Sequence, residues 1–394
     1  MNTITAPSPP TMMGEMRRAA AASHHDCGYA LTLGEICQQP ETWRQTAQAA
    51  NARRAEIEEI TKGRAAIVLT GSGSSQFAAE CIHPLIRTQA ALTVGSGEIL
   101  LQGRAVLPRG KLCLVSLARS GDSPESVGVV QMLLEAAPEI RHLIVTCNAN
   151  GKLAKLAAAD SRLHAIVLDQ RINDRSLVMT SSLTNMVIAG TVLACDEGYL
   201  EKVDALAAAA QLLIDSHAAA LQTIAQGPFH KAVYLGSGCR YGAAREAALK
   251  MLEMTDGRVM TLAENCLSLR HGPMCAIDDG TLVVCFLSSD LLRRAYECDL
   301  LRELTRKQLG WRRVITGIDI PGDLLGEGDV GIDLTPAAAC GDPWLAVLDV
   351  VVGQLLGFFR SLHEGLKPDA PSASGVISRV VNEFTIHRRA GPHV

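Results

Sequence analysis

The sequence predicts an α/β protein built from two consecutive units, each a mainly parallel sheet flanked by helices in three layers. Apolar runs of strand length alternate with helical segments, and these runs are apolar almost throughout, as in parallel strands covered on both faces. The order of strand, Gly-Ser-Gly turn and helix then occurs twice, with Gly236 following Gly71 by 165 residues. One repeat of this length is typical of a duplicated domain.

The length of 394 residues leaves room for two or three domains. We expect an N-terminal extension and lead-in helix over residues 1–50, a first domain over 51–215 and a second over 216–394. Pro, Ser, Thr and Ala dominate residues 1–25, which we expect to be disordered or loosely attached. A helix is expected over residues 42–60, where Ala, Arg and Glu are frequent.

The first unit contains four expected strands and four expected helices. The strands are residues 65–69, 111–117, 142–147 and 165–168. The first helix begins near Phe77, directly after the Gly-Ser-Gly turn, and the others are residues 127–135, 179–195 and 204–225. The second unit repeats this pattern. Its expected strands are residues 231–236, 281–289 and 313–316, and its expected helices are residues 243–254, 291–308 and 344–363.

Composition narrows the classes of partner. The net charge is −4 and both signs are interspersed, so no basic surface for nucleic acid or an anionic membrane is expected. Twelve cysteines are scattered without a Cys-x-x-Cys pair, which is typical of reduced thiols in a cytoplasmic protein and not of a disulfide framework or zinc site. We find no signal peptide, and expect no apolar run near the roughly 20 residues that span a bilayer.

Two serine-rich loops follow strands of the first unit. They are Gly71-Ser-Gly-Ser-Ser75 and Arg119-Ser-Gly-Asp-Ser123, the latter followed by Pro124 with Ser123 as helix cap. Hydroxyls and glycine amides at the carboxyl ends of parallel strands can converge on an anion, helped by the positive ends of the following helices. The alternative is two ordinary turns, since neither loop is a complete dinucleotide or Walker motif.

The helix after the second Gly-Ser-Gly turn carries three charged residues on one face. Glu246, Lys250 and Glu253 recur at i, i+4 and i+7. For an arbitrary helix this pattern indicates a solvated face. Because the helix starts directly after the turn, we expect its opening turns to lie near the ligand edge of the sheet, where a carboxylate could transfer a proton. His271, beside Gly272 and Pro273, is either structural or a candidate for catalysis.

Together these motifs resemble the sugar isomerase (SIS) domain family of phosphosugar isomerases and synthases. The resemblance rests on residues 118–126, 236–253 and 269–273. It is nearer still to the bacterial galactosamine-6-phosphate deaminase/isomerase group (AgaS), also labelled tagatose-6-phosphate ketose/aldose isomerase. Met179-Thr-Ser-Ser182 and Pro371-Ser-Ala-Ser-Gly375 are the more specific motifs for that group.

The resemblance implies a role for nine residues of this sequence. Ser75, Ser120 and Ser123 would bind the substrate phosphate, with Arg119 beside them. Glu253 would be the base that moves a proton between C2 and C1, and His271 would assist ring opening, in relatives often across a dimer interface. Lys250, Glu246 and Ser74 would support the base and the sugar. No metal or cofactor is implied, and the protein is expected to be a homodimer or a larger homo-oligomer.

Three departures from the synthases matter. Ala118 stands where they have a phosphate-binding serine, no C-terminal lysine aligns near Ser378 and Arg379, and residues 1–50 are too short for a glutaminase domain. The resemblance therefore favours conversion of galactosamine 6-phosphate and water to tagatose 6-phosphate and ammonium. Three alternatives stay open: a plain aldose-ketose phosphosugar isomerase, a glucosamine-6-phosphate deaminase, and a phosphosugar sensor without catalysis.

Overall fold

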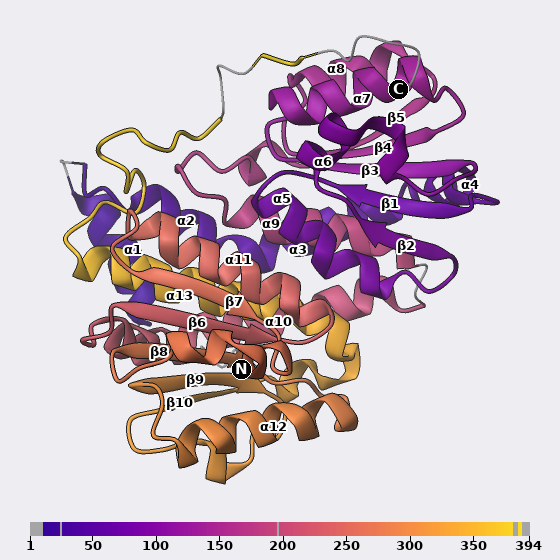
Figure 1. Cartoon of the computed structure of the whole chain (residues 1–394). Coiled ribbons are helices and arrows are strands. Elements are labelled where there is room, and N and C mark those ends of the chain that lie inside the picture. Colours follow the sequence, from indigo (N-terminus) through magenta and orange to yellow (C-terminus); the bar gives the residue numbers. More distant parts are fainter. Residues whose placement is uncertain (1–10, 24–25, 195–196, 381–384, 388–394) are drawn as a thin grey trace, which may run out of the picture.

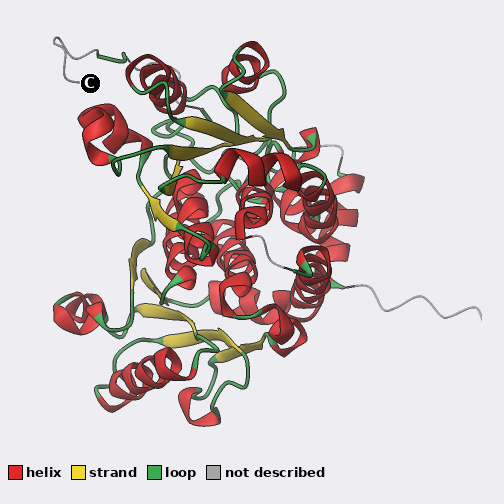
Figure 2. Ribbon diagram, turned by 90° about the vertical axis from the view of Figure 1, so that its right-hand side faces the viewer, coloured by secondary structure: helices red, strands yellow, loops and turns green. Residues whose placement is uncertain are grey.

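The computed structural model describes residues 11–23, 26–194, 197–380 and 385–387. Two five-stranded sheets, parallel throughout, lie toward opposite ends of the molecule with a layer of helices between them (Figure 1). The second view shows the same helices stacked between the sheets (Figure 2). The predicted α/β class with two helix-flanked parallel sheets is confirmed.

The two sheets share one topology. The first has the order β2-β1-β3-β4-β5 and the second the order β7-β6-β8-β9-β10. The strands of the first sheet are β1 (Ala66–Thr70), β2 (Ala90–Thr93), β3 (Leu112–Ala118), β4 (Arg141–Thr146) and β5 (Leu163–Val167). Those of the second are β6 (Lys231–Gly236), β7 (Met260–Glu264), β8 (Thr281–Phe286), β9 (Arg312–Gly317) and β10 (Val330–Asp333). In each sheet the second strand lies on one side of the first strand, and the third strand lies on the other side. The switch point of the strand order is therefore between β1 and β3 in the first sheet and between β6 and β8 in the second. Such sheets bind ligands at this point.

Central and edge strands differ in burial, and three of the four edge strands were not predicted from the sequence; the exception is β5, which was predicted at residues 165–168. The central strands β1, β3 and β8 are buried at every position and were predicted as apolar runs. The edge strands β2, β7 and β10 are short and partly exposed, and the sequence did not predict them. An edge strand has one hydrogen-bonded neighbour and less buried area, so its sequence carries a weaker apolar signal.

Helices fall into three groups. Those of the first unit are α5 (Ser74–Ile82), α6 (Ser96–Gln102), α7 (Pro124–Ala136), α8 (Lys152–Ala159) and α9 (Ser181–Gly190). Those of the second are α11 (Cys239–Met254), α12 (Leu291–Arg306) and α13 (Ala346–His363). The lead-in and linking helices are α1 (Met12–Ala22), α2 (Ala30–Cys37), α3 (Gln39–Asn51), α4 (Arg54–Thr61) and α10 (Tyr199–Ala225). The domain boundary predicted at 215/216 falls inside α10 and stays a prediction.

Two expectations for the N-terminal region are wrong. Within the described part of residues 1–25, α1 is an ordered helix capped by the Thr11 hydroxyl, and Met13 is buried against the helical layer. Residues 1–10 and 24–25 lie outside the described residues. The single helix expected over residues 42–60 is two helices, α3 and α4, separated by Ala52 and Arg53.

The expectation about apolar length is also wrong. The segment Asp342–His363, which includes α13, is long and apolar enough by composition to cross a membrane. However, 94% of its apolar window is buried inside the molecule, where α13 packs against α10 and α11. Its apolar character is therefore explained by its place as the core helix of the central layer.

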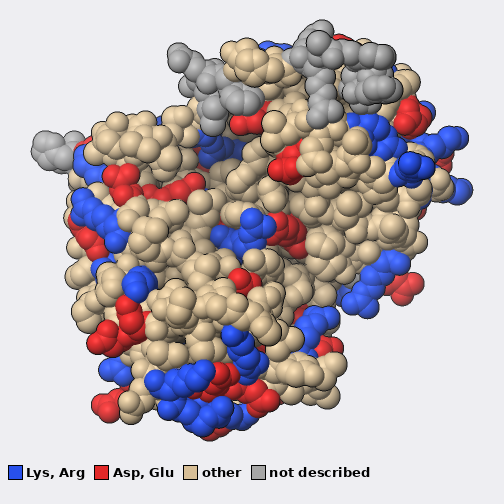
Figure 3. All heavy atoms as spheres, viewed as in Figure 1, with Lys and Arg blue, Asp and Glu red and all other residues tan. Residues whose placement is uncertain are grey.

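On the face shown in Figure 3, basic and acidic side chains are intermixed.

Candidate active site

The turn after β1 is built around two glycines. A Cβ on Gly71 would lie 2.6 Å from the backbone of Ser75, and Gly73 has a φ of 55°, a conformation that side chains disfavour. This tight turn places Ser74 and Ser75 in the first turn of α5. The backbone N–H groups of a first helical turn have no partner within the helix. Both serines are almost fully buried. The hydroxyl of Ser75 makes no hydrogen bond to another described residue.

The loop after β3 lies beside this turn because β1 and β3 are neighbours at the switch point. Ser123 occupies the N-cap position of α7, as predicted, but its hydroxyl does not cap the helix. Ser120 accepts a hydrogen bond from the Asp122 amide (3.2 Å), and Asp122 in turn accepts from Asn148 and the Lys152 amide. Asp122 thus holds the serine loop to the segment that contains Asn148 and Lys152. The structure brings both predicted serine loops together at one sheet edge.

Arg119 is 93% buried and only partly paired. One guanidinium nitrogen donates to the backbone carbonyl of Arg379, in the C-terminal tail, while Nη1 has no partner among the described residues. Burial lowers the pKa of Arg119, and the carboxylate of Asp174 partly offsets that effect. An unpaired, buried cationic nitrogen beside two serine loops is suited to an anionic ligand.

A buried charge chain connects α5 to α11. Lys250 Nζ lies 2.5 Å from Glu253 Oε2 and 3.3 Å from Glu246 Oε1, and it donates to the Ser74 hydroxyl (3.1 Å). Ser74 in turn donates to Glu246 Oε1 (3.2 Å). Glu246 and Lys250 are fully buried, whereas the Glu253 side chain is 24% exposed. Glu253 is thus the carboxylate of the chain that a ligand can reach.

The charges within this chain shift one another. Burial raises the pKa of Glu246 to about 7, although Lys250 opposes the rise. For Lys250 burial acts to lower the pKa, but Glu246 and Glu253 outweigh it, and the net pKa is raised. Lys250 therefore stays protonated and holds the Glu253 side chain in place through a hydrogen bond.

A solvated face is the wrong interpretation of Glu246, Lys250 and Glu253. The expectation that they lie near a ligand edge because the helix starts there is also wrong. They occupy the middle and C-terminal end of α11, not its opening turns at the second Gly-Ser-Gly turn. Instead, α11 crosses the helical layer and packs closely on α5 and α13. A Cβ on Gly242 would lie 2.9 Å from the Cys81 backbone, and a Cβ on Gly357 3.2 Å from the Lys250 carbonyl oxygen. This packing carries Glu253 to the edge of the first sheet.

His271 lies apart from the charge chain. It ends the 3-10 turn Ser268–His271 after β7, and its side chain is exposed. No hydrogen bond or ion pair joins it to Ser74, Glu246, Lys250 or Glu253 within the described residues. The preceding Arg270 is anchored by Glu303 at 2.8 Å.

Two buried carboxylates behind the loops were not predicted. Asp174 accepts hydrogen bonds from the Thr180 and Ser182 amides (2.8 and 2.9 Å) and so shapes the Met179–Ser182 turn that starts α9. Glu35 accepts from the Arg175 and Ser176 amides. Burial and the nearby Asp174 raise the pKa of Glu35 to about 7. The Met179–Ser182 motif was the sequence signal for this region. The support that Asp174 and Glu35 give it as buried carboxylates depends on tertiary packing, which the sequence does not reveal.

Within the described residues, no group of His, Cys, Asp and Glu has the geometry of a metal site.

Comparison with known proteins identifies the family. No protein-family model matches the chain. It is 34% identical over 373 residues, 90% of this chain and 95% of the relative, to a putative D-galactosamine-6-phosphate deaminase AgaS of Streptomyces coelicolor. The chain belongs to the AgaS family. A second AgaS, the D-galactosamine-6-phosphate deaminase of Escherichia coli, is 33% identical over 90% of this chain and 95% of its own length.

Solved structures agree with the AgaS assignment. The tagatose-6-phosphate ketose/aldose isomerase of Escherichia coli superposes with a TM-score of 0.82 at 31% identity, covering 90% of this chain and 96% of its own. A glucosamine-6-phosphate deaminase of Thermotoga maritima has a TM-score of 0.68 at 21% identity, covering 89% of this chain and 99% of its own, which shows a shared fold. The predicted family resemblance and the tandem SIS fold are confirmed.

Proposed function

We propose that this AgaS protein is an isomerising deaminase that converts galactosamine 6-phosphate and water to tagatose 6-phosphate and ammonium. The observation that carries the proposal is the buried chain Ser74–Glu246–Lys250–Glu253, which ends in an accessible carboxylate at the sheet edge with the two serine loops. Relatives named for this deamination, at 33–34% identity over 90% of the chain, support the substrate. A phosphosugar sensor would not need such a carboxylate.

In the proposed mechanism the phosphate binds to the hydroxyls of Ser75, Ser120 and Ser123, at the starts of α5 and α7. Arg119 Nη1 supplies a charged donor beside them. This end of the substrate is fixed first, and the binding energy orients the reacting carbons toward Glu253.

Proton transfer then involves α11. Once the sugar ring is open, Glu253 removes the proton at C2, and the electron pair moves to the C1 carbonyl, whose oxygen gains a proton. Glu253 returns its proton to C1 as the amine nitrogen becomes a C2 imine. Water adds to the imine carbon, the C–N bond breaks, and ammonium leaves with the ketose phosphate. Lys250 keeps Glu253 oriented, and Ser74 and Glu246 position Lys250.

We further propose that ring opening uses the partner subunit's His271, because the His271 of the same chain is exposed and makes no hydrogen bond or ion pair with the charge chain within the described residues. The active protein would then be a homodimer or a larger assembly. Free cysteines throughout the described residues support a cytoplasmic location.

Ammonium release from galactosamine 6-phosphate and from glucosamine 6-phosphate tests the reaction. Release from the galacto sugar alone supports the proposal. Release from the gluco sugar alone would retain the mechanism but contradict the substrate, and no release from either would contradict deamination.

Subunit mixing tests the shared site. Dimers of Glu253→Gln and His271→Ala chains form one intact site in each heterodimer if His271 acts across the interface. Random mixing then restores about a quarter of wild-type activity, because half of the dimers are mixed and each has one intact site. If both residues act within one chain, no activity returns.

A further inference from the structure

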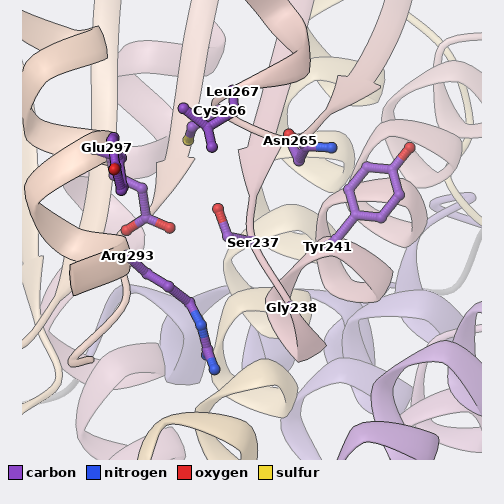
Figure 4. A pocket seen from close by; sticks show the side chains of 9 residues that line it. Ser237, Gly238, Tyr241, Asn265, Cys266, Leu267, Arg293 and Glu297 are labelled. Atoms are coloured by element: carbon purple, nitrogen blue, oxygen red, sulfur yellow. The ribbon is translucent and has the colours of Figure 1, made fainter. Parts of the chain in front are cut away.

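The carboxyl edge of the second sheet contains a cavity of about 350 Å³. Its walls are the turn after β6, the segment after β7 and the first turns of α12 (Figure 4). The cavity lies at the start of α11, whereas Glu253 lies near its end. At 1.5 Å of rise per residue the two are about 20 Å apart, so the cavity is separate from the proposed active site.

Glu297 is the unusual group in this cavity. Its side chain is 99% buried, and Oε2 accepts a hydrogen bond from the Ser288 amide at 2.7 Å. Oε1 is buried and has no partner in the described part of the chain. In Figure 4 the carboxylate points toward Ser237 and the cavity. Burial raises the pKa of Glu297, and the nearby Ser237 hydroxyl partly offsets that rise. A ligand that donates to Oε1 would satisfy this acceptor.

The charges around the cavity disfavour a phosphate. The β8 loop offers the donors that would hold one, but internal carboxylates already accept them. Asp342 accepts from the Ser288 hydroxyl (2.8 Å) and the Ser289 amide (2.7 Å). Arg293, at the mouth, is itself 3.4 Å from Asp342. An added phosphate would therefore meet Asp342 and Glu297 with few donors left for it.

The remaining lining suits a hydroxylated amine. Tyr241 and Tyr296 both line the cavity, as does Asn265. The ring of Tyr241 and the amide of Asn265 are seen in Figure 4. Rings of this kind attract a cationic amine and pack against the apolar face of a sugar. We propose that the cavity binds an unphosphorylated amino sugar, with its amine on Glu297 and its ring beside Tyr241 and Tyr296.

Calorimetric titration of the full chain with galactosamine, galactose and galactose 6-phosphate tests this site. We expect galactosamine to bind at least about tenfold more tightly than galactose, since only its amine pairs with the carboxylate. Galactose 6-phosphate reports on the phosphate loops of the proposed active site, so its binding should be the same in the wild type and in Glu297→Gln. Glu297→Gln should weaken galactosamine binding by about tenfold or more. Tyr296→Ala, at a half-exposed position, should weaken it as well and guards against a folding defect in the first variant.

Glu253→Gln distinguishes the two sites, because it alters the proposed active site and leaves the cavity intact. Galactosamine binding that survives this substitution and is lost with Glu297→Gln supports the proposal. Binding lost with Glu253→Gln instead would assign the ligand to the active site. Absence of galactosamine binding, equal binding of galactosamine by Glu297→Gln, or equally tight binding of galactose would each overturn the proposal.

Discussion

The carboxyl edges of the two sheets share one type of turn, but their polar groups are bonded differently. Gly71 and Gly236 each approach the backbone four residues ahead, and Gly73 and Gly238 each adopt a positive φ before a helix. At the first edge the hydroxyls of Ser75 and Ser123 lie beside a buried arginine and make no hydrogen bonds with described residues. At the second, the donors of the serine loop are already bonded to carboxylates of the protein itself.

Asp342 accounts for most of this difference. It accepts two hydrogen bonds shorter than 3 Å from Ser288 and Ser289 and lies 3.5 Å from Arg240. An internal carboxylate thus occupies the position that corresponds to the proposed phosphate site of the first edge. Fold alone therefore does not make a phosphate site. What matters is whether the donors of the turn are left for a ligand.

The second unit contributes to the first edge by another route. Arg240 binds Asp349 through two hydrogen bonds of 2.6 and 2.7 Å, which fasten the start of α11 to α13. With one end fixed there, the other end of α11 presents Glu253 to the first sheet. In the proposed mechanism the second unit thus contributes the helix that carries the base, and not a second phosphate site.

The largest expected effect is that of Glu253→Gln. The amide keeps the shape of the side chain but cannot accept the C2 proton, so kcat for ammonium release should fall about 10²–10⁴-fold. Glu201→Gln, on an exposed position of α10, is the matched control and should leave kcat unchanged. Wild-type turnover in the Glu253 variant would exclude Glu253 as the base.

Lys250→Met should give the next largest effect. It removes the cation from between Glu246 and Glu253 and leaves buried acceptors unpaired, which costs about 3–5 kcal/mol of unfolding free energy. Urea denaturation measures the loss. A Lys250→Met/Glu246→Gln double variant should be more stable than the sum of its single changes, because Glu246 no longer needs a partner. Strictly additive losses would show that the pair is not coupled.

The fold was largely predictable from sequence, while the site was predictable in part. Apolar runs revealed the central strands, because parallel strands are buried on both faces. The serine loops followed from the strand order. The spacing of Glu246, Lys250 and Glu253 placed them on one helical face, but their meeting with Ser74 depends on how α11 packs against α5. Likewise nothing near Ser288 in sequence indicates that Asp342, 54 residues later, accepts its hydroxyl.

The pH dependence of stability tests whether Glu246 is as buried as the structure shows. Its pKa rises from 4.5 to about 7 on folding. Between these values the folded state keeps the proton and the unfolded state loses it, so stability falls as pH rises. Relative to Glu246→Gln, the wild type should lose about 3 kcal/mol between pH 4.5 and 7. Glu35 is present in both proteins and cancels in this difference. A gain with rising pH would contradict the burial.

The smallest effect separates the two edges most directly. Ser123→Ala removes a hydroxyl proposed to bind phosphate, so KM for the phosphosugar should rise about tenfold, as expected for one hydrogen bond to a charged group. The loss of an N-cap usually destabilises a helix by about 1 kcal/mol, but this hydroxyl makes no capping bond, so the melting temperature should change little. Ser289→Ala, the counterpart at the second edge, removes a hydroxyl that bonds Asp342 at 3.3 Å. It should leave KM unchanged, because that loop already holds an anion of its own. If Ser289→Ala raised KM as much as Ser123→Ala, phosphate recognition would involve both edges, and the carboxylate of Asp342 would not explain their difference.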